Sequence, residues 1–371
     1  MTCAATQQQT AAPLIAWLSR TEALRSIEES SATIDAAGNP ANPFCTSAWL
    51  HHFTCEVVPP TARIAVVESA RSGRSLMLLW ARTQSDGRLH ALANYYSSLY
   101  TPVLSSSTDR LGAATDLARE LVRARPRLVT LNLSPLADDN PETAQLAETM
   151  AGAGWFVRRY ACFGNWTLPC EGLSFADYLA TRDSQLRNTL ARKAKKLQAA
   201  GSLQICTAVD EVEQAMDGFD AVYAKSWKEP EPYPNFIRGW ARRCAERGWL
   251  RLGLARVGDT VIAAQFWFTI ARRAHIFKLA YDEAYAKWSA GTVLTAKMFE
   301  HAMMVDKVVE IDYLTGDDAY KKSWMTQRRE RIGLIACNLS TVAGLATASR
   351  EWAGAATSSW RARLRSAIPT A

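Results

Sequence analysis

The chain has 371 residues, of which 48% are hydrophobic and 21% are charged, and its formal net charge at pH 7 is +7. This length and composition predict a globular protein with a large core and two domains. They exclude a transmembrane helix, because no run approaches ~18 apolar residues. They also argue against a DNA-binding protein, because the positive charge is modest. The first residues do not predict a secretory signal, because they lack a basic n-region.

The eight cysteines and five histidines give no sign of a metal centre or a disulfide scaffold. No two cysteines form a C-x-x-C pair, and no histidine lies at a repeating ligand spacing from them. We therefore expect free, mostly buried thiols, no metal, and a cytoplasmic location. A Ser-His-Asp hydrolase finds little support, because its histidine would have to be chosen arbitrarily among scattered candidates.

Residues 13–165 predict one α/β unit. Strands are expected at "ARIAVVES", "SLMLLWART" and "RLHALANYYSS", followed by a helix at "TDRLGAATDLARELVRA" and a strand at "RLVTLNLSPL". The strand segments are rich in β-formers, whereas the helical segment repeats its apolar residues at helical spacing.

Residues 166–338 predict a second unit with a similar order of elements. A basic helix, a strand at "SLQICTAV", two further helices and the Pro-rich loop "KEPEPYP" precede three strands at "WLRLGLARV", "TVIAAQFWFTI" and "AHIFKLAYD". A helix, a strand at "KVVEIDYLTG", a polar turn at "DDAYKKSWM" and a strand at "RRERIGLIAC" follow. Because the order recurs, we interpret the chain as a duplicated α/β fold with mixed sheets, although many α/β chains look alike at this level.

Residues 339–371 form a basic, Ala/Ser-rich tail. Leu345, Trp352 and Trp360 fit one face of an amphipathic helix, and a poorly ordered tail is the alternative.

A turn of small residues, Ser289, Ala290 and Gly291, directly precedes the apolar-periodic helix of the second unit. The first N–H groups of a helix lack intrahelical acceptors and carry partial positive charge, so this turn predicts an anion site. The hydroxyls of Ser289 and Thr292 add donors, and Gly291 allows close approach. The alternative is that Ser289 is an ordinary N-cap.

Several motifs of the second unit occur in a family's order: "LRNTLARKAKKLQAAG", "KSWKEP", "GDTVIAAQF", "AYDEAYAKWSAGTVL" and "IDYLTGDDAYKKSW". Together they resemble the BioF2-like, CelD-type acetyltransferase domain of the GNAT superfamily. The tandem arrangement resembles that of the FemAB/FemX-like transferases. Two positions depart from the family pattern: Ala290 replaces the usual Pro, and Ser226 replaces the usual Arg.

The resemblance implies a GNAT-family N-acyltransferase. Its donor would be an acyl-CoA, with an acetyl or longer chain, or an acyl carrier, with the pyrophosphate or pantetheine region near Ser289–Thr292. The acceptor would be an amine of a sugar, an amino acid or a cell-envelope or exopolysaccharide precursor. Two alternatives stay open: a FemX-like transferase that uses aminoacyl-tRNA, and a non-catalytic scaffold in polysaccharide biosynthesis.

Acyl transfer to an amine requires a base, an oxyanion donor and an acid for the leaving thiolate. Asp312 is the candidate base or amine anchor, with Asp282 as a second candidate. Tyr320 is the candidate acid, and Lys321 is a candidate to bind phosphate or orient the donor. Packing of Tyr320 in a turn, and acceptance of a loop N–H by Asp312, are the structural alternatives.

The acceptor side is expected near Trp227, in the Pro-rich loop, and Asp282. In the first unit, "NYYSSLYTP" occupies the place of the donor turn but has Pro102 and no glycine. We therefore predict that the first unit does not bind donor and instead shapes the acceptor side.

The basic helix at residues 182–196 suits tRNA or an anionic membrane surface, which would place the protein at the periphery of the inner membrane. The alternative is a solvated helix face.

Overall fold

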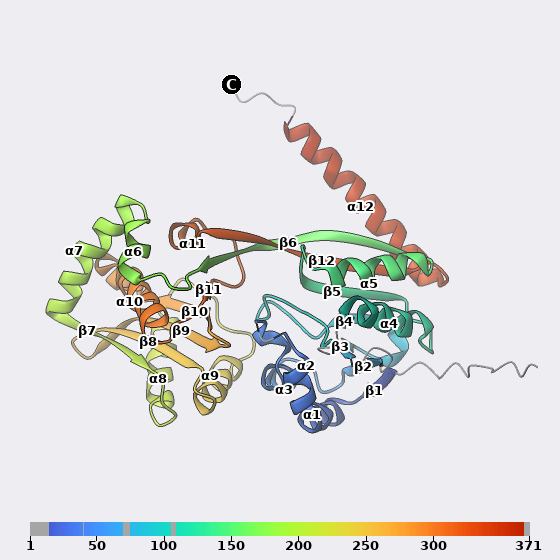
Figure 1. Ribbon diagram of the computed structural model, residues 1–371, viewed down its shortest axis with the longest axis horizontal. Coiled ribbons are helices and arrows are strands. Elements are labelled where there is room, and N and C mark those ends of the chain that lie inside the picture. The colour runs from blue at the N-terminus through green and yellow to red at the C-terminus, as the bar shows by residue number, and fades with distance from the viewer. Residues whose placement is uncertain (1–14, 40, 70–74, 105–108, 367–371) are drawn as a thin grey trace, which may run out of the picture.

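One mixed sheet runs through the protein, as the computed structural model shows. The structure describes residues 15–39, 41–69, 75–104 and 109–366, and for residues 355–366 it describes the backbone alone. Within these residues the sheet has 12 strands in the order β1-β2-β3-β4-β5-β12-β6-β11-β10-β9-β8-β7. Helices cover its faces, and Figure 1 shows an N-terminal and a C-terminal half joined by two long central strands.

The N-terminal half alternates helices with a mostly antiparallel sheet. Its elements are β1 (Ile15–Leu18), α1 (Arg20–Glu29), α2 (Ser31–Ala37), η1 (Pro43–Cys45), α3 (Ser47–Glu56), β2 (Arg63–Ser69), β3 (Ser75–Ala81), η2 (Gln84–Asp86), β4 (Arg88–Ala91), α4 (Arg110–Arg123), β5 (Thr130–Ala137) and α5 (Pro141–Gly152). The helix α1 begins at a capping box, in which Ser19 and Glu22 exchange side-chain and backbone hydrogen bonds. Strands β4 and β5 are parallel, as a helical crossover through α4 allows.

The C-terminal half repeats that plan. Its elements are α6 (Phe175–Ala180), α7 (Ser184–Ala200), β7 (Gly201–Cys206), α8 (Val212–Tyr223), α9 (Phe236–Glu246), β8 (Leu250–Val257), β9 (Thr260–Ile270), β10 (Arg273–Tyr281), η3 (Glu283–Trp288), α10 (Ala290–Met304), β11 (Glu310–Asp312) and α11 (Ala319–Trp324). Strands β10 and β11 are parallel and are joined through α10, just as β4 and β5 are joined through α4. This recurrence confirms the predicted fold class.

The two central strands are exchanged between the halves. β6 (Trp155–Pro169) follows the N-terminal half but pairs with β11, whereas β12 (Gln327–Asn338) follows the C-terminal half but pairs with β5. β6 and β12 also pair with each other along most of their length. The halves therefore share one continuous sheet. The predicted boundary after residue 165 falls inside β6, and the division into two domains stays a prediction.

An apolar cluster joins helices of both halves below the sheet, where α3 contacts α9. The fully buried ring of Trp49 on α3 lies edge-on to Trp240 at 4.9 Å and to Phe236 at 5.6 Å, both on α9. Nε2–H of His52 donates to the carbonyl of Phe236 at 2.8 Å. The loop preceding Phe236 is thus anchored from the N-terminal half.

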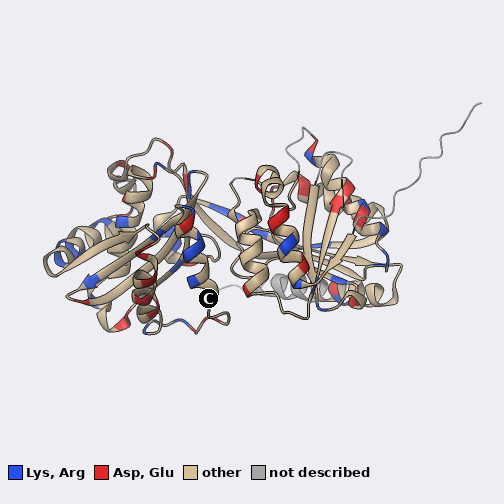
Figure 2. Cartoon of the chain, turned by 90° about the horizontal axis from the view of Figure 1, so that it is seen from below, with Lys and Arg blue, Asp and Glu red and all other residues tan. Residues whose placement is uncertain are grey.

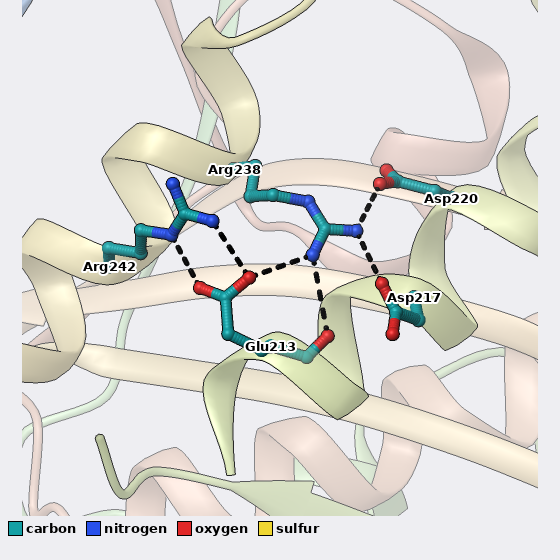
Figure 3. Close-up of polar contacts among 5 residues, drawn as sticks. All are labelled: Glu213, Asp217, Asp220, Arg238 and Arg242. Atoms are coloured by element: carbon teal, nitrogen blue, oxygen red, sulfur yellow. Dashed lines mark hydrogen bonds and ion pairs between the residues drawn. The ribbon is translucent and has the colours of Figure 1, made fainter. Parts of the chain in front are cut away.

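A surface ion network fixes α9 against α8 (Figure 3). Arg238 pairs with Glu213, Asp217 and Asp220, and Arg242 pairs with Glu213. Exposed pairs of this kind contribute little stability singly, so their main effect is to orient the two helices. These helices flank the loop 224–235.

The structure corrects three details of the predicted elements. Strand β4 ends at Ala91, because Asn94 forms an Asx turn in which its side chain accepts from the N–H of Tyr96 at 2.9 Å. The predicted polar turn "DDAYKKSWM" contains the short helix α11. Strand β11 has only the residues Glu310–Asp312.

The C-terminal tail forms the helix α12 (Val342–Ser366), which projects from the body of the molecule (Figure 1). This agrees with the helical interpretation of the tail. Leu345 and Trp352 are exposed, while the side chain of Trp360 lies outside the described part. Among the helices described, none combines the length and hydrophobicity needed to cross a bilayer.

Candidate functional site

A cavity of about 730 Å³ opens where β10 and β11 separate. The two parallel strands pair only from Arg273 opposite Glu310 to His275 opposite Asp312. Beyond that point the residues 276–281 of β10 and 313–315 after β11 line opposite walls of the cavity. A split between parallel strands at their carboxyl ends is a common place for ligands in α/β sheets.

Strand β10 has an irregularity at this split. Its register against β9 shifts between Ile276 and Lys278, so that Phe277 is left out of the ladder. Bulges of this kind unpair a residue and redirect the strand. Phe277 and Lys278 both line the cavity.

The start of α10, where the sequence predicted an anion site, lines the cavity. Ser289, Ala290, Gly291 and Thr292 all line it. The first intrahelical bond is donated by Val293 to the carbonyl of Ser289 at 3.1 Å, so the N–H groups of residues 290–292 have no acceptor within the helix. These donors and the positive end of the helix favour an anion here.

Ser289 has a left-handed backbone, with φ of 52°, and its side chain makes no capping hydrogen bond to the helix. The ordinary N-cap interpretation therefore does not account for this serine. Strained residues of this type persist where the surrounding structure holds them, often at ligand sites.

The space beside Gly291 belongs to the cavity. A Cβ atom added to Gly291 would have Tyr281 as its nearest neighbour, at 3.7 Å, which is ordinary contact. The carbonyl of Gly291 accepts from Nε2 of Gln265 at 3.0 Å and from Oγ1 of Thr295 at 2.9 Å. The protein's own packing therefore does not require glycine here, but it does hold the turn rigidly against β9.

Tyr320 reaches the cavity from α11. Its hydroxyl lies 3.0 Å from Oγ1 of Thr295, which in turn accepts from Gln265 Nε2 at 2.7 Å. The ring is 39% exposed, but burial of the hydroxyl raises the pKa of Tyr320 above its ordinary value. Tyr320 therefore stays protonated at neutral pH, and its hydroxyl donates to Thr295, because the single hydroxyl proton of Thr295 goes to the carbonyl of Gly291.

Tyr313 is a second phenol at this wall that the sequence interpretation did not single out. It is 2% exposed, lines the cavity, and its hydroxyl has no hydrogen-bond partner among the described residues. A buried polar group without a partner is unusual and invites a ligand or water. The sequence signal that could have pointed to Tyr313 was its place in "IDYLTG", next to Asp312.

Lys321 lines the cavity but is held by the loop before α11. Its ammonium donates to the carbonyls of Thr315 and Tyr313 and lies 3.7 Å from the carboxylate of Asp318. Burial lowers the pKa of Lys321, and the charge of Asp318 opposes this. The arrangement fits a role in shaping the loop 313–318.

The structure places Asp312 and Asp282 outside the set of described residues that line the cavity. Oδ1 of Asp312 accepts from Asn165 Nδ2 at 2.6 Å and from the N–H of Leu314 at 2.7 Å, and Asn165 in turn accepts from the buried Arg331 at 2.7 Å. Oδ1 of Asp282 accepts from the N–H of Ala284 at 3.0 Å, which caps η3. Both side chains thus carry local structural contacts.

The far wall of the cavity comes from the loop 224–235 and the N-terminal half. Trp227 is half exposed, and its ring centroid lies 4.8 Å from that of Tyr281. Tyr95 and Tyr96, from the "NYYSSLYTP" segment, also line the cavity. Sequence reasoning named Trp227 and this segment but missed the lysines beside them, Lys228 and Lys278. The sequence signal that could have pointed to Lys278 was a lysine inside the apolar strand "AHIFKLAYD".

The equivalent split in the N-terminal half is filled. After the parallel pairing of β4 with β5, Tyr100 enters the gap: its N–H donates to Pro135 at 2.6 Å and its hydroxyl to the carbonyl of Leu78 at 2.9 Å. The remaining cavity near Thr101 and Pro102 measures only about 20 Å³. That is room for about one water molecule.

The basic helix α7 lies against the segment that leads into the α10 turn, and Figure 2 shows its cationic residues at the outer end of the C-terminal half. Lys193 donates to the carbonyl of Lys287 at 2.5 Å, and the ammonium of Lys196 lies 4.4 Å from the ring centroid of Trp288. In the described part of the chain, no three His, Cys, Asp or Glu side chains gather as a metal site would require.

Solved structures share this fold at low sequence identity. The C-terminal domain of a putative lysylphosphatidylglycerol synthetase from Agrobacterium fabrum has a TM-score of 0.55 at 13% identity, covering 87% of this chain and 95% of that one. FemX has a TM-score of 0.57 at 10% identity, covering 84% and 96%. A conserved protein of unknown function from Bacteroides thetaiotaomicron has 0.56 at 11%, covering 85% and 97%. No curated protein matched the chain.

The chain therefore shares its fold with these structures, FemX among them. Residues 184–322 match the family described as an acetyltransferase (GNAT) domain. This confirms the GNAT resemblance seen in the sequence, and the matched residues include the α10 turn, Tyr313 and Tyr320, which line the cavity.

Proposed function

We propose that the protein transfers an acyl group from an acyl-CoA or acyl-carrier thioester to an amine of a sugar, an amino acid or a cell-envelope precursor. The observation that carries this proposal is the cavity itself. It unites the free N–H groups at the start of α10, the Tyr320 hydroxyl and an unpaired stretch of β10. An extended donor arm fits between the separated strands, and its phosphates fit the positive end of α10.

The reaction forms a bond between the amine nitrogen and the thioester carbonyl carbon, and it breaks the C–S bond. Tyr320 supplies a proton to the leaving thiolate, because its raised pKa keeps it protonated. The amine loses a proton to Asp318, the carboxylate among the described cavity-lining residues, or to water beyond it. Asp312 and Asp282 support the walls in this scheme, by fixing the Leu314 turn and η3.

The N-terminal half is proposed to shape the acceptor side. Tyr95 and Tyr96 of the N-terminal half line the cavity together with Trp227 of the loop 224–235. The plugged split at Tyr100 supports a single donor site per chain.

Substitution of Gly291 tests the donor site. Gly291→Ala places a methyl group in ordinary contact with Tyr281 and is expected to keep the fold, whereas Gly291→Trp fills the cavity at the α10 start. Calorimetric titration with acetyl-CoA and longer acyl-CoAs is expected to show binding that Gly291→Trp abolishes and Gly291→Ala weakens less. Equal donor affinity of both variants and the wild type, or no acyl-CoA binding at all, would overturn the proposal.

A second candidate is transfer from aminoacyl-tRNA, favoured by the shared fold with FemX and by the basic helix α7 next to the donor turn. Replacing Lys193, Lys195 and Lys196 by Glu would then reduce affinity for tRNA, measured by filter binding, without changing affinity for acetyl-CoA. An anionic membrane surface is the other proposed partner of α7, at the cytoplasmic face of the inner membrane. A purely scaffolding protein would show neither donor binding nor transfer.

A further inference from the structure

Lys228 is a cation of the cavity wall that makes no ion pair or side-chain hydrogen bond among the described residues. It follows Trp227 in the loop between α8 and α9, and its ammonium lies 5.8 Å from the ring centroid of Tyr223 and 5.7 Å from that of Trp227. Aromatic faces stabilise a cation weakly, but they do not neutralise it.

The nearest carboxylate is already fully engaged. Glu231 accepts from the hydroxyl of Tyr96 at 2.5 Å and of Tyr223 at 2.6 Å, and it pairs with the ammonium of Lys278. Burial alone would raise the pKa of Glu231, but these donors hold it below the ordinary value. Glu231 therefore stays ionised and its charge is balanced by Lys278.

Lys321 is likewise satisfied, by loop carbonyls and by Asp318. After these pairings one positive charge remains in the wall, on Lys228. The charged groups that face it are Lys278 from β10, Glu231 from its own loop, Asp318 just before α11, and Lys321 on α11. Burial and then the charge of Lys278 lower the pKa of Lys228 to about 8, although Glu231 opposes this. A half-buried cation in this setting lacks a counter-ion.

We propose that Lys228 binds an anionic group, a carboxylate or a phosphate, on the amine acceptor, and that it acts as a charged anchor. This inference rests on the proposed function, because it assigns the acceptor to the same cavity. The position supports the acceptor over the donor: Lys228 faces Lys278, whose ammonium lies 4.9 Å from the ring centroid of Tyr96 of the N-terminal half. Donor phosphates have their own site at the start of α10, on the wall fixed by Gln265 and Thr295.

The preferred acceptor is therefore an acidic amine, such as an amino-sugar phosphate or an amino acid, and not a neutral amine. The rings of Trp227, Tyr95 and Tyr96 offer a flat surface to the rest of such a molecule. Anion binding would also return the pKa of Lys228 toward that of an ordinary lysine.

The first experiment measures anion binding at Lys228 without any acyl transfer. The full-length protein is labelled with an amine-acylating reagent near about pH 8 in rising concentrations of inorganic phosphate, and peptides are quantified by mass spectrometry. Labelling of Lys228 is expected to slow along a saturation curve, by about tenfold when phosphate is about ten times its half-maximal concentration. Lys322, which is exposed and lies outside the lining of the cavity, is the internal control. Equal behaviour of the two lysines overturns the proposal.

Three variants separate an anchor from other roles. Lys228→Met removes the charge, Lys228→Arg keeps a permanent charge that cannot lose a proton, and Lys322→Met removes a charge outside the cavity. Thermal stabilisation by phosphate is expected to disappear in Lys228→Met only. If Lys228→Arg behaves like Lys228→Met, the amine itself is needed, as a base or nucleophile, and the anchor role is overturned.

The last arm identifies the source of the anion. With saturating CoA present, phosphate is still expected to protect Lys228, and Lys228→Met is expected to bind CoA and pantetheine as the wild type does. If Lys228→Met weakens binding of CoA but not of pantetheine, the anion belongs to the donor and the acceptor assignment is wrong. Failure of CoA to bind at all would remove the proposed donor, whereas phosphate protection of Lys228 would stand independently.

Discussion

Tyr96 of the N-terminal half donates its hydroxyl to Oε2 of Glu231 of the C-terminal half at 2.5 Å. The ring of Tyr96 also stacks on Phe236 of α9, with centroids 4.1 Å apart and planes 3° from parallel. This contact closes one end of the cavity with residues more than a hundred positions apart in sequence. It is possible because the exchange of β6 and β12 joins the halves into one sheet.

Tyr96→Phe tests that contact. The change keeps the stacked ring and removes one hydrogen bond to a carboxylate, so the free energy of unfolding is expected to fall by about 1–2 kcal/mol in urea titrations. Affinity for acetyl-CoA is expected to stay unchanged, while the KM for the acceptor rises, because Glu231 loses a donor that fixes the acceptor end. Tyr285→Phe is the control, since Tyr285 lines the same cavity and its hydroxyl makes no hydrogen bond within the described part of the chain. A loss of donor affinity in Tyr96→Phe would contradict this division of the cavity.

Tyr320→Phe tests the acid for the thiolate. The variant keeps the ring on α11 and loses the hydroxyl next to Thr295, so kcat is expected to fall by about 10²-fold or more with donor affinity nearly unchanged. Because burial raises the pKa of Tyr320, the wild-type rate is expected to show no loss from tyrosine ionisation up to about pH 9. Thr295→Val is the companion variant, which leaves the hydroxyl of Tyr320 in place and removes its partner. A wild-type kcat in Tyr320→Phe would exclude it as the acid.

The free N–H groups of the α10 turn could be predicted from sequence because their chemistry is local. A strand, three small residues and a periodic helix suffice to place free N–H groups at a helix start, and the structure has them at Ala290–Thr292 in the wall of the cavity. The order of strands and helices was equally readable, because apolar periodicity is a local property. The same reasoning predicted that the first unit does not bind donor, since Pro102 and the missing glycine are visible in the sequence, but it did not predict that Tyr100 fills the split there.

The residues of the proposed acceptor side and the positions of the carboxylates could not be predicted from the sequence, because they depend on non-local geometry. An aspartate at the end of a buried strand has the same sequence signature whether it points into a cavity or into a network between strands. Asp312 is held by Asn165 of β6, and its position follows from the strand exchange, which no spacing in the sequence announces. Lys228 likewise could not be recognised from the sequence as an unpaired cation, because this depends on the fact that Lys278, and not Lys228, pairs with Glu231.

Asp312→Asn separates a structural from a catalytic role for this carboxylate. The change removes the negative charge that faces the buried Arg331 through Asn165, although the amide oxygen of an asparagine can still accept from Asn165 and from Leu314. We expect a loss of about 2–4 kcal/mol in the free energy of unfolding. Asp282→Asn, which affects the cap of η3 and a long ion pair with the exposed Lys225, is expected to cost about 1 kcal/mol or less. If Asp312→Asn is as stable as the wild type but has lost its kcat, Asp312 is the base after all.

Two buried histidines predict that the fold weakens in acid. Burial lowers the pKa of His52 and of His275 to about 4. The hydrogen bond of His52 to Phe236 and the charge of Asp312 near His275 oppose this lowering. Between about pH 4 and about pH 6.5 the unfolded chain therefore binds more protons than the folded one. The free energy of unfolding should accordingly be highest above about pH 6.5 and fall by about 3 kcal/mol per histidine as the pH approaches 4.

His275→Leu tests this origin, because both ring nitrogens of His275 lack partners among the described residues and a leucine leaves no polar atom there. The variant is expected to match or exceed the wild type near about pH 8 and to lose less stability at about pH 5, in urea titrations at both values. The measurement near about pH 8 is the internal control, since both proteins then have a neutral side chain at this site. An unchanged acid slope in His275→Leu would assign the acid sensitivity to other groups.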